Sequence, residues 1–411
     1  MLKNHTLIRA MLSALVLCAM VPIASGSGFA IIEQSPSRIG TAFAGATANN
    51  EDAGAIYWNP AGIASISNVE VIVGINSILP SFTFKDTGST PIGGGSGGDA
   101  GVDAWVPNFY AVMGISDTIT AGIGVFAPYG LKTRYDADWI GRYAAVETEL
   151  VTLDINPTLA IKLSESLSIG AGFTAEHADA TLISAVPLAP GVDGLATVEG
   201  DDWAYGYNLG AMCTLPCGVR VGLSYRSAID HELDGDIRIG PLPSEGGTAD
   251  LELPETAAIG LHIPLCDTLS LQADAAWTGW SSFEDLTVVK DDDSILSTKD
   301  ESWEDTWRVA VGLTYQVNDG LVLRTGVAHD QSPVPDAEHR TARIPDADRT
   351  WLAAGAGLDL TDALTLDVGY VHIWFNDSDV IDVYDPTAGA ALVGTYEGDV
   401  DIVSLQLKWA M

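Results

Sequence analysis

Apolar and polar residues alternate with a period of two in many short segments of this chain. In residues 219–226 every odd position is apolar and every even position is small or polar, and residues 307–315 repeat this pattern. The same alternation occurs in residues 167–174, 269–275 and 403–409. Because successive side chains of a β-strand point to opposite faces, the alternation predicts strands that each have one apolar face.

Tight turns and long polar connections separate these segments in a regular order. Tight turns are predicted at residues 116–118, 164–166, 216–218, 266–268, 318–320 and 361–363. Long connections are predicted near residues 85–104, 129–149, 181–201, 240–250, 290–302, 331–348 and 377–394. Together they join about 14 strands, and short turns on one side with long loops on the other are typical of a transmembrane β-barrel. We therefore predict an all-β fold, an antiparallel transmembrane barrel over residues 69–411, in preference to a soluble β-sandwich.

Aromatic residues near the predicted strand ends fit this barrel. Such residues gather in girdles at the two membrane–water interfaces. The expected girdle residues are Trp277, Trp303, Tyr315, Tyr370 and Trp409.

The first 26 residues are typical of a signal peptide. Lys3 and Arg9 give a positive n-region, residues 10–21 are apolar, and Ala24 and Gly26 precede an expected cleavage site. The apolar stretch is shorter than the roughly 20 residues of a membrane-spanning helix. We therefore expect residues 1–26 to be removed on export rather than kept as an anchor.

The net charge excludes some partners. Loss of Lys3 and Arg9 leaves 17 of the 19 basic residues against 55 acidic ones, so the formal net charge falls from −36 to −38. Nucleic acid and anionic headgroups would be repelled by such a chain. Because 47% of the residues are hydrophobic, the acidic composition does not predict disorder.

The sequence contains no recognised catalytic or metal-binding motif. No HExxH or CxxC sequence occurs, and the six of the seven histidines that follow the expected signal peptide are scattered singly, at positions 177, 231, 262, 329, 339 and 372. We therefore expect no enzymatic activity, no metal and no cofactor, and keep an outer-membrane barrel enzyme as the alternative from another class. Cys213, Cys217 and Cys266 all fall in predicted turns, and both one disulfide and none remain open.

Residues 27–68 break the alternation and are rich in small residues, which predicts a compact plug inside the barrel. A plug argues against a general diffusion porin. The segment contains Gly28-Phe29, Gly40 with Ala42-Phe43-Ala44-Gly45, Asp52-Ala53-Gly54 and Asn59-Pro60-Ala61-Gly62. In these motifs it resembles the N-terminal hatch of the FadL family, the outer-membrane long-chain fatty acid transporters, which includes importers of aromatic hydrocarbons.

Two later segments, residues 128–150 and 330–355, also resemble this family. They contain Gly141-Arg142-Tyr143, Ser332-Pro333-Val334-Pro335-Asp336 and the run from Ile344 to Arg349. The chain departs from the usual aromatic C-terminus of outer-membrane barrels, because it ends Trp409-Ala410-Met411. This departure concerns the assembly signal and not the predicted fold.

The resemblance implies a function in the outer membrane of a Gram-negative bacterium. It implies a monomer, surrounded by lipid and lipopolysaccharide, that binds hydrophobic small molecules in the barrel. They would be released laterally into the bilayer through a gap in the wall that the hatch controls. Long-chain fatty acids are the first expected cargo, and neutral aromatic hydrocarbons such as toluene are the alternative.

The resemblance also assigns candidate gating residues. It implies that Asn59, Pro60 and Ala61 contact an inward-bent third strand. Gly122 and Gly124 lie in that predicted strand, residues 119–126, where glycine permits a kink or a close backbone approach.

A fatty acid carboxylate in a partly desolvated lumen requires a cationic partner. Alternation places Arg220, Arg226, Arg308, Arg324 and Lys408 on the lumen face. The loop candidates are Lys132, Arg134, Arg142, Arg340 and Arg343. Arg142 and Arg324 are the leading candidates, although most of these cations are expected to pair with Asp or Glu.

Overall fold

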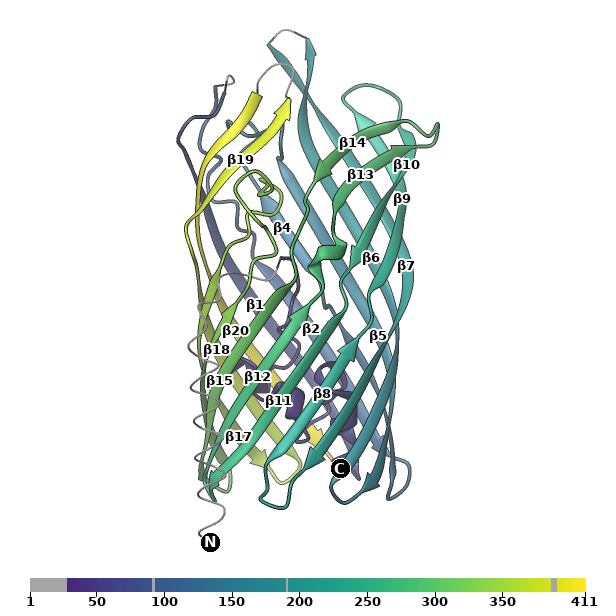
Figure 1. Ribbon diagram of the computed structural model, residues 1–411, viewed down its shortest axis with the longest axis vertical. Helices are drawn as coiled ribbons and strands as arrows, with labels where there is room; N and C mark the ends of the chain where they lie inside the picture. The colour runs from purple at the N-terminus through teal and green to yellow at the C-terminus, as the bar shows by residue number, and fades with distance from the viewer. Residues whose placement is uncertain (1–27, 91–92, 190, 386–389) are drawn as a thin grey trace.

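A computed structural model of the chain describes residues 28–90, 93–189, 191–385 and 390–411. The expected signal peptide, residues 1–26, lies outside these residues. Fourteen antiparallel strands form a closed barrel, in which β20 pairs with both β18 and β1 (Figure 1). The barrel strands are β1 (Val69–Asp86), β2 (Ala104–Gly114), β3 (Ile119–Phe126), β5 (Glu147–Ser164), β6 (Leu167–Ala189), β7 (Val192–Thr214), β8 (Arg220–Arg226), β11 (Thr256–Cys266), β12 (Leu269–Thr278), β15 (Thr306–Asn318), β16 (Leu321–Asp330), β17 (Arg349–Thr361), β18 (Leu364–Phe375) and β20 (Ala390–Ala410).

The long connections contain strands of their own at one end of the barrel, at the top of Figure 1. These strands are β4 (Gly130–Arg134), β9 (Ile229–Ile239), β10 (Glu245–Leu253), β13 (Asp285–Lys290), β14 (Ile295–Asp300) and β19 (Ser378–Asp385). The polar loop expected near residues 181–201 is instead largely a continuation of β6 and β7, which pair from Leu167 and Cys213 to Ala189 and Val192. Backbone pairing does not require an apolar face, so the strands continue where the membrane pattern has ended.

Apolar residues face outward along the wall. Tyr315, Tyr370 and Trp409 are exposed on the outer surface as expected. Trp303 is buried, so its placement in a girdle was wrong. It lies in the loop before β15, whose path over the lumen is not encoded in the strand pattern. Among the described residues, no helix is both long and apolar enough to cross a membrane.

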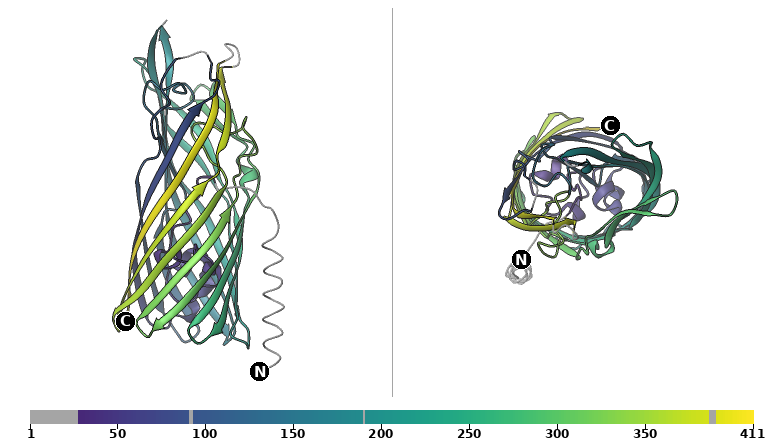
Figure 2. Two further views of the ribbon diagram at one scale, coloured as in Figure 1. Left: turned by 90° about the vertical axis from the view of Figure 1, so that its left-hand side faces the viewer. Right: turned by 90° about the horizontal axis from the view of Figure 1, so that it is seen from above.

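The hatch lies inside the barrel, as the view from above in Figure 2 shows, and it fills the end of the lumen that has the short turns, at the bottom of Figure 1. Its helical turns are α2 (Pro36–Ile39), η1 (Ala46–Ala48), α3 (Ala55–Trp58) and η2 (Pro60–Ser65), and a further turn, η3 (Trp280–Ser282), lies in a loop. Facing glycines on neighbouring strands make room for it: Gly170 with Gly210, Gly222 with Gly260, Gly312 with Gly326, and Gly355 with Gly369. A Cβ at Gly222 would lie 1.9 Å from the Thr47 carbonyl oxygen, which explains the small residues on the lumen face.

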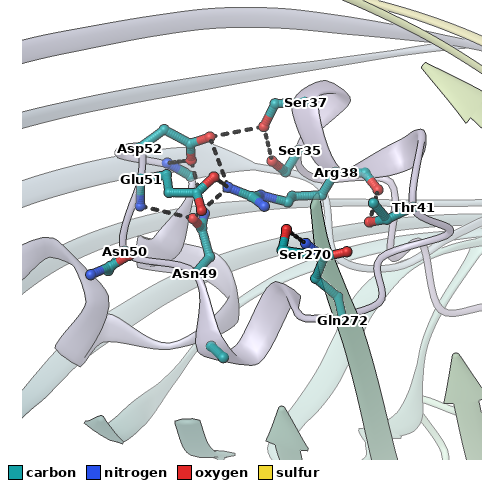
Figure 3. Close-up of polar contacts among 12 residues, drawn as sticks. Ser35, Ser37, Arg38, Thr41, Asn49, Asn50, Glu51, Asp52, Ser270 and Gln272 are labelled. Carbon is teal, nitrogen blue, oxygen red and sulfur yellow. Dashed lines mark hydrogen bonds and ion pairs between the residues drawn. The ribbon is translucent and has the colours of Figure 1, made fainter. Parts of the chain in front are cut away.

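Polar contacts tie the hatch together (Figure 3), and others join it to the wall. Arg38 donates to Glu51 at 2.6 Å and to Asn49 at 2.7 Å. Arg220 of β8 donates to the same Glu51 at 3.0 Å, so one hatch carboxylate joins an arginine of the hatch to one of the wall. The pKa of Glu51 lies well below its usual range, chiefly because of Arg38. Charge-assisted bonds of this kind are strong, and they fix this part of the hatch.

Candidate functional site

A largely apolar cavity of about 470 Å³ lies between the N-terminal stretch of the hatch and the wall. The hatch contributes residues 28–31 and Glu33. The wall contributes apolar residues that include Ile78, Phe82, Val106, Leu150, Ile373, Phe375, Val400 and Ile402. The lining of β1, β2, β5, β18 and β20 thus encloses a space suited to an apolar solute.

The wall is interrupted beside this cavity. β3 ends at Phe126, and its pairing with β2 ends at Val125 and Phe109. β5 pairs with β3 as far as Asp154, and from Val151 to Glu147 it pairs with β4. Between β3 and β4 the chain bonds to the hatch: Ile31 donates to the Pro128 carbonyl at 2.7 Å, and Gly130 donates to that of Phe29 at 3.0 Å. Residues 127–129 therefore bend toward the lumen, away from the line of the wall.

The cavity reaches the outer surface at this interruption. Its lining includes Trp105, Val151 and Leu153, whose exposed fractions are 67%, 49% and 43%. These side chains belong to the outward face of β2 and β5. The cavity therefore connects the interior near Phe29 with the face of the barrel that contacts lipid.

A second apolar cavity, of about 70 Å³, shares part of this lining. Phe29, Leu131, Leu150 and Ile344 line both cavities, and Phe283, Leu233, Leu251 and Leu286 continue the second. The ring of Phe29 lies 4.8 Å from Trp280, 5.7 Å from Phe283 and 5.6 Å from Trp303. Sequence reasoning missed this aromatic cluster, because its members come from the hatch and from a loop about 250 residues later.

The predicted gating residues occupy two places. Asn59 donates to the carbonyls of Thr47 at 2.8 Å and of Ala211 in β7 at 3.1 Å, and it accepts from the Ala61 amide. Pro60 and Ala61 lie against Gly170 and Gly210, whose added Cβ atoms would meet them at 2.4–3.0 Å. These contacts fall on β6 and β7, whereas the resemblance implied a contact with the bent third strand.

The contact with β3 comes instead from α3. A Cβ at Gly122 would lie 2.8 Å from Cδ1 of Ile56, and one at Gly124 would lie 3.0 Å from Cγ2 of the same residue. Both glycines remain in regular register with β2 and β5. Of the two roles considered for these glycines, the structure shows the close approach, and the bend follows at residues 127–129.

The lumen-facing arginines are engaged by other groups of the barrel and hatch. Arg226 lies 3.3 Å from Asp154 and Arg324 lies 2.7 Å from Asp367, while Arg308 donates to the Ala42 carbonyl at 2.8 Å. Arg226 and Arg308 line a third, more polar cavity of about 100 Å³ beside Tyr57 and Trp58. Arg324 lies near the short turns, against Gly40 of the hatch.

The loop cations differ in their partners. Lys132 lines the large cavity and pairs with Glu149 at 2.6 Å, and Arg134 pairs with Glu147 at 2.5 Å. Arg142 pairs with Asp193 at 2.9 Å. Arg340 donates to the carbonyls of Asp346 and Asp379, at 2.8 and 2.5 Å. Arg343 donates to Oγ1 of Thr148 at 3.3 Å.

Four charged residues of the large cavity were absent from the candidates, namely Glu33, Glu149, Asp346 and Arg349. Burial raises the pKa of Glu33 to about 7, against the opposing effect of its backbone bond and of Arg349 and Arg308. Asp346 accepts from the Gly28 amide at 3.0 Å and so ties the start of the hatch to the segment 331–348. The motifs around Gly28 and Asp346 were the signal that could have located this contact.

Metal ligands and thiols lie away from the cavities. Within the described residues, the one group of three potential metal ligands within 4.8 Å is His372, Asp399 and Asp401, on the outer face of the wall. Cys213, Cys217 and Cys266 are free thiols.

Comparisons with known proteins agree with this architecture. Residues 16–410 match the family described as "Outer membrane protein transport protein (OMPP1/FadL/TodX)". The chain is 32% identical to the long-chain fatty acid transport protein of Escherichia coli, over 84% of this chain and 87% of that protein, and equally to that of Salmonella typhi. Among solved structures, it superimposes on a Pseudomonas aeruginosa FadL homologue with a TM-score of 0.87 at 25% identity, covering 93% and 99% of the two chains.

The fold extends to more distant proteins. The Ralstonia pickettii toluene transporter TbuX superimposes with a TM-score of 0.69 at 16% identity, covering 92% of this chain and 100% of that one. This likeness concerns the fold alone. From the match over nearly its whole length, the chain belongs to the OMPP1/FadL/TodX family, non-enzymatic outer-membrane β-barrels of Gram-negative bacteria that transport hydrophobic compounds.

Proposed function

We propose that this protein imports long-chain fatty acids, acting as a monomer that binds them in the large cavity and releases them sideways into the bilayer. The observation that carries the proposal is the cavity that runs from Phe29 to the outward-facing Trp105, Val151 and Leu153. Relatives that are 32% identical are named long-chain fatty acid transport proteins. One chain forms both the cavity and the gap, so the route requires no second copy.

The chemistry of the cavity suits an aliphatic chain. Its volume of about 470 Å³ falls within the range of roughly 300–1,000 Å³ typical of small-molecule sites. Each methylene group that leaves water for such a lining gains about 0.8 kcal/mol. A water-filled pore offers no such gain, and the apolar lining therefore favours hydrophobic cargo.

In the proposed gate, the N-terminal stretch of the hatch moves and the rest stays in place. Residues 28–31 line the cavity and are held by the bonds from Gly28 to Asp346 and between Ile31 and Pro128. Asn59, Pro60 and Ala61 anchor the remainder against β6 and β7. Gly122 and Gly124 allow Ile56 to support β3 below the bend at residues 127–129.

Neutral aromatic hydrocarbons are the second candidate cargo. The rings of Phe29 and Phe283 line the apolar cavities, and those of Trp280 and Trp303 pack behind them, with the three other centroids 4.8–5.7 Å from that of Phe29. Aromatic rings favour contact with other aromatic rings in this range of distances. An aromatic solute would therefore find partners at this site.

Uptake of labelled oleate and labelled toluene, in cells lacking their own transporter, tests the proposal. Leu153→Trp narrows the gap, and Leu405→Trp is the matched control, because Leu405 is also exposed on the outer wall. We expect oleate uptake by the wild type and the control, and a loss of severalfold in Leu153→Trp. Toluene uptake alone would favour the second cargo, and uptake of neither solute by assembled barrels would contradict the proposal.

A further inference from the structure

Arg343 stands apart from the other cations near the two apolar cavities. Lys132 and Lys299 have carboxylate partners, at 2.6 and 3.0 Å, and Arg340 has two backbone carbonyls. For Arg343, no carboxylate oxygen of the described residues lies within 4.0 Å, and its guanidinium donates to one hydroxyl, that of Thr148. The side chain is half-buried in the lumen, so part of its donor capacity is free to meet a ligand.

The acids nearest to Arg343 leave its charge uncompensated. Asp382 of β19 and Glu301, in the loop before β15, are the acids that act on it electrostatically. Asp382 already pairs with Lys299 of β14. Glu301 is buried and accepts a hydrogen bond from Trp303 Nε1 at 3.2 Å, and burial raises its pKa to about 8. At neutral pH, Glu301 is therefore mostly protonated and supplies no full counter-charge.

Arg343 also lies beside the apolar lining. Its hydrogen-bond partner Thr148 and its chain neighbour Ile344 both line the second cavity, and Ile344 lines the large one as well. The two acids that line the second cavity have cations of their own, since Glu149 pairs with Lys132 and Glu199 with Arg238. A ligand with its tail in the apolar space can therefore bring its head to the guanidinium and to the Thr148 hydroxyl without meeting an unpaired carboxylate.

We infer that Arg343, with Thr148, is the residue that selects carboxylic acids over neutral hydrocarbons in this transporter. A guanidinium matches a carboxylate with two parallel hydrogen bonds, and a partly desolvated cation gains most from such a partner. The inference rests on the proposed function and narrows it, because it names long-chain acids as the substrate class and assigns the head group to the end of the barrel that has the long connections.

Equilibrium binding to the purified protein in detergent tests the inference, with labelled oleate and labelled methyl oleate as the two probes. The ester has the same tail but no negative charge. The variants are Arg343→Gln, Arg343→Lys and the control Arg134→Gln, which removes an exposed guanidinium paired with Glu147. We expect Arg343→Gln to weaken oleate binding about tenfold or more and to leave the ester unchanged. Arg343→Lys should weaken oleate binding less, since it keeps the positive charge. The control should bind both probes as the wild type does.

Equal losses for oleate and the ester in Arg343→Gln would show that Arg343 serves structure, and unchanged oleate binding would show that the acid is held elsewhere. Either result overturns the role of Arg343 and leaves the proposed import of hydrophobic compounds standing. Binding of neither probe by the folded wild type would overturn both.

Discussion

At the scale of single residues, the lumenal cations are compensated in different ways. Arg324 has a carboxylate at 2.7 Å, Arg340 has two backbone carbonyls, and Arg343 has one hydroxyl. A buried ion pair satisfies both partners and leaves little for a ligand. Arg142 and Arg324, the leading candidates from the sequence, are both held in ion pairs, whereas Arg343 retains donor capacity beside an apolar lining.

The protonation of Glu301 makes oleate binding depend on pH. Burial raises its pKa to about 8, so below that pH the group is neutral and Arg343 attracts the acid. Above that pH, Glu301 becomes negative and competes with the oleate carboxylate for Arg343. We expect oleate affinity to fall severalfold between pH 7 and pH 9. In Glu301→Gln the fall should disappear, and an unchanged fall in that variant would assign the pH dependence to another group.

At the scale of elements, the hatch depends on the glycines of the wall. Asn59 and Pro60 sit against Gly210, where an added Cβ would lie 2.0 Å from Asn59 Oδ1 and 2.8 Å from Pro60 Cδ. The Asn59 amide is held by its bonds to Thr47, Ala211 and Ala61, and the ring of Pro60 is rigid, so neither can move aside freely. The wall therefore determines where the anchored part of the hatch lies.

Gly210→Ala tests this anchoring without changing the hatch itself. Overpacking of this kind costs about 1–3 kcal/mol, so we expect a loosened hatch and greater entry of small hydrophilic solutes. Gly320→Ala is the control, because its new Cβ would have no neighbour closer than 3.9 Å. Solute-entry assays in liposomes compare the two, and equal permeability of both assembled variants would contradict the anchoring role.

The elements were largely predictable from the sequence, and the site was predictable only in part. Alternation and turn chemistry are local properties, so all six tight turns fall between successive barrel strands. The groups that interact with Arg343 are not local in sequence. Thr148, which accepts its hydrogen bond, is 195 positions away, and Glu301, which acts on it electrostatically, is 42 positions away. Trp303 shows the same limit: its position near a strand end suggested the girdle, but its loop folds over the lumen and buries it against Phe29.

At the scale of the whole molecule, the barrel, the hatch and the loops divide the lumen into separate spaces. The large apolar cavity opens toward lipid beside β2 and β5, and the polar cavity lies beside Arg226 and Arg308. A hydrophobic solute that follows the apolar lining leaves through the wall. A solute that passed through the polar cavity instead would contact residues of β8, β11, β12 and β15, so the two routes contact different residues.

Photo-crosslinking during uptake distinguishes these routes most directly, with oleate that carries a diazirine near the end of its chain. We expect crosslinks to Trp105, Val151 and Leu153 at the gap and to Phe29 inside it. We expect none above background at Thr256, Ala276 or Thr306, which line the polar cavity. Crosslinks at the polar cavity, with none at the gap, would contradict lateral release.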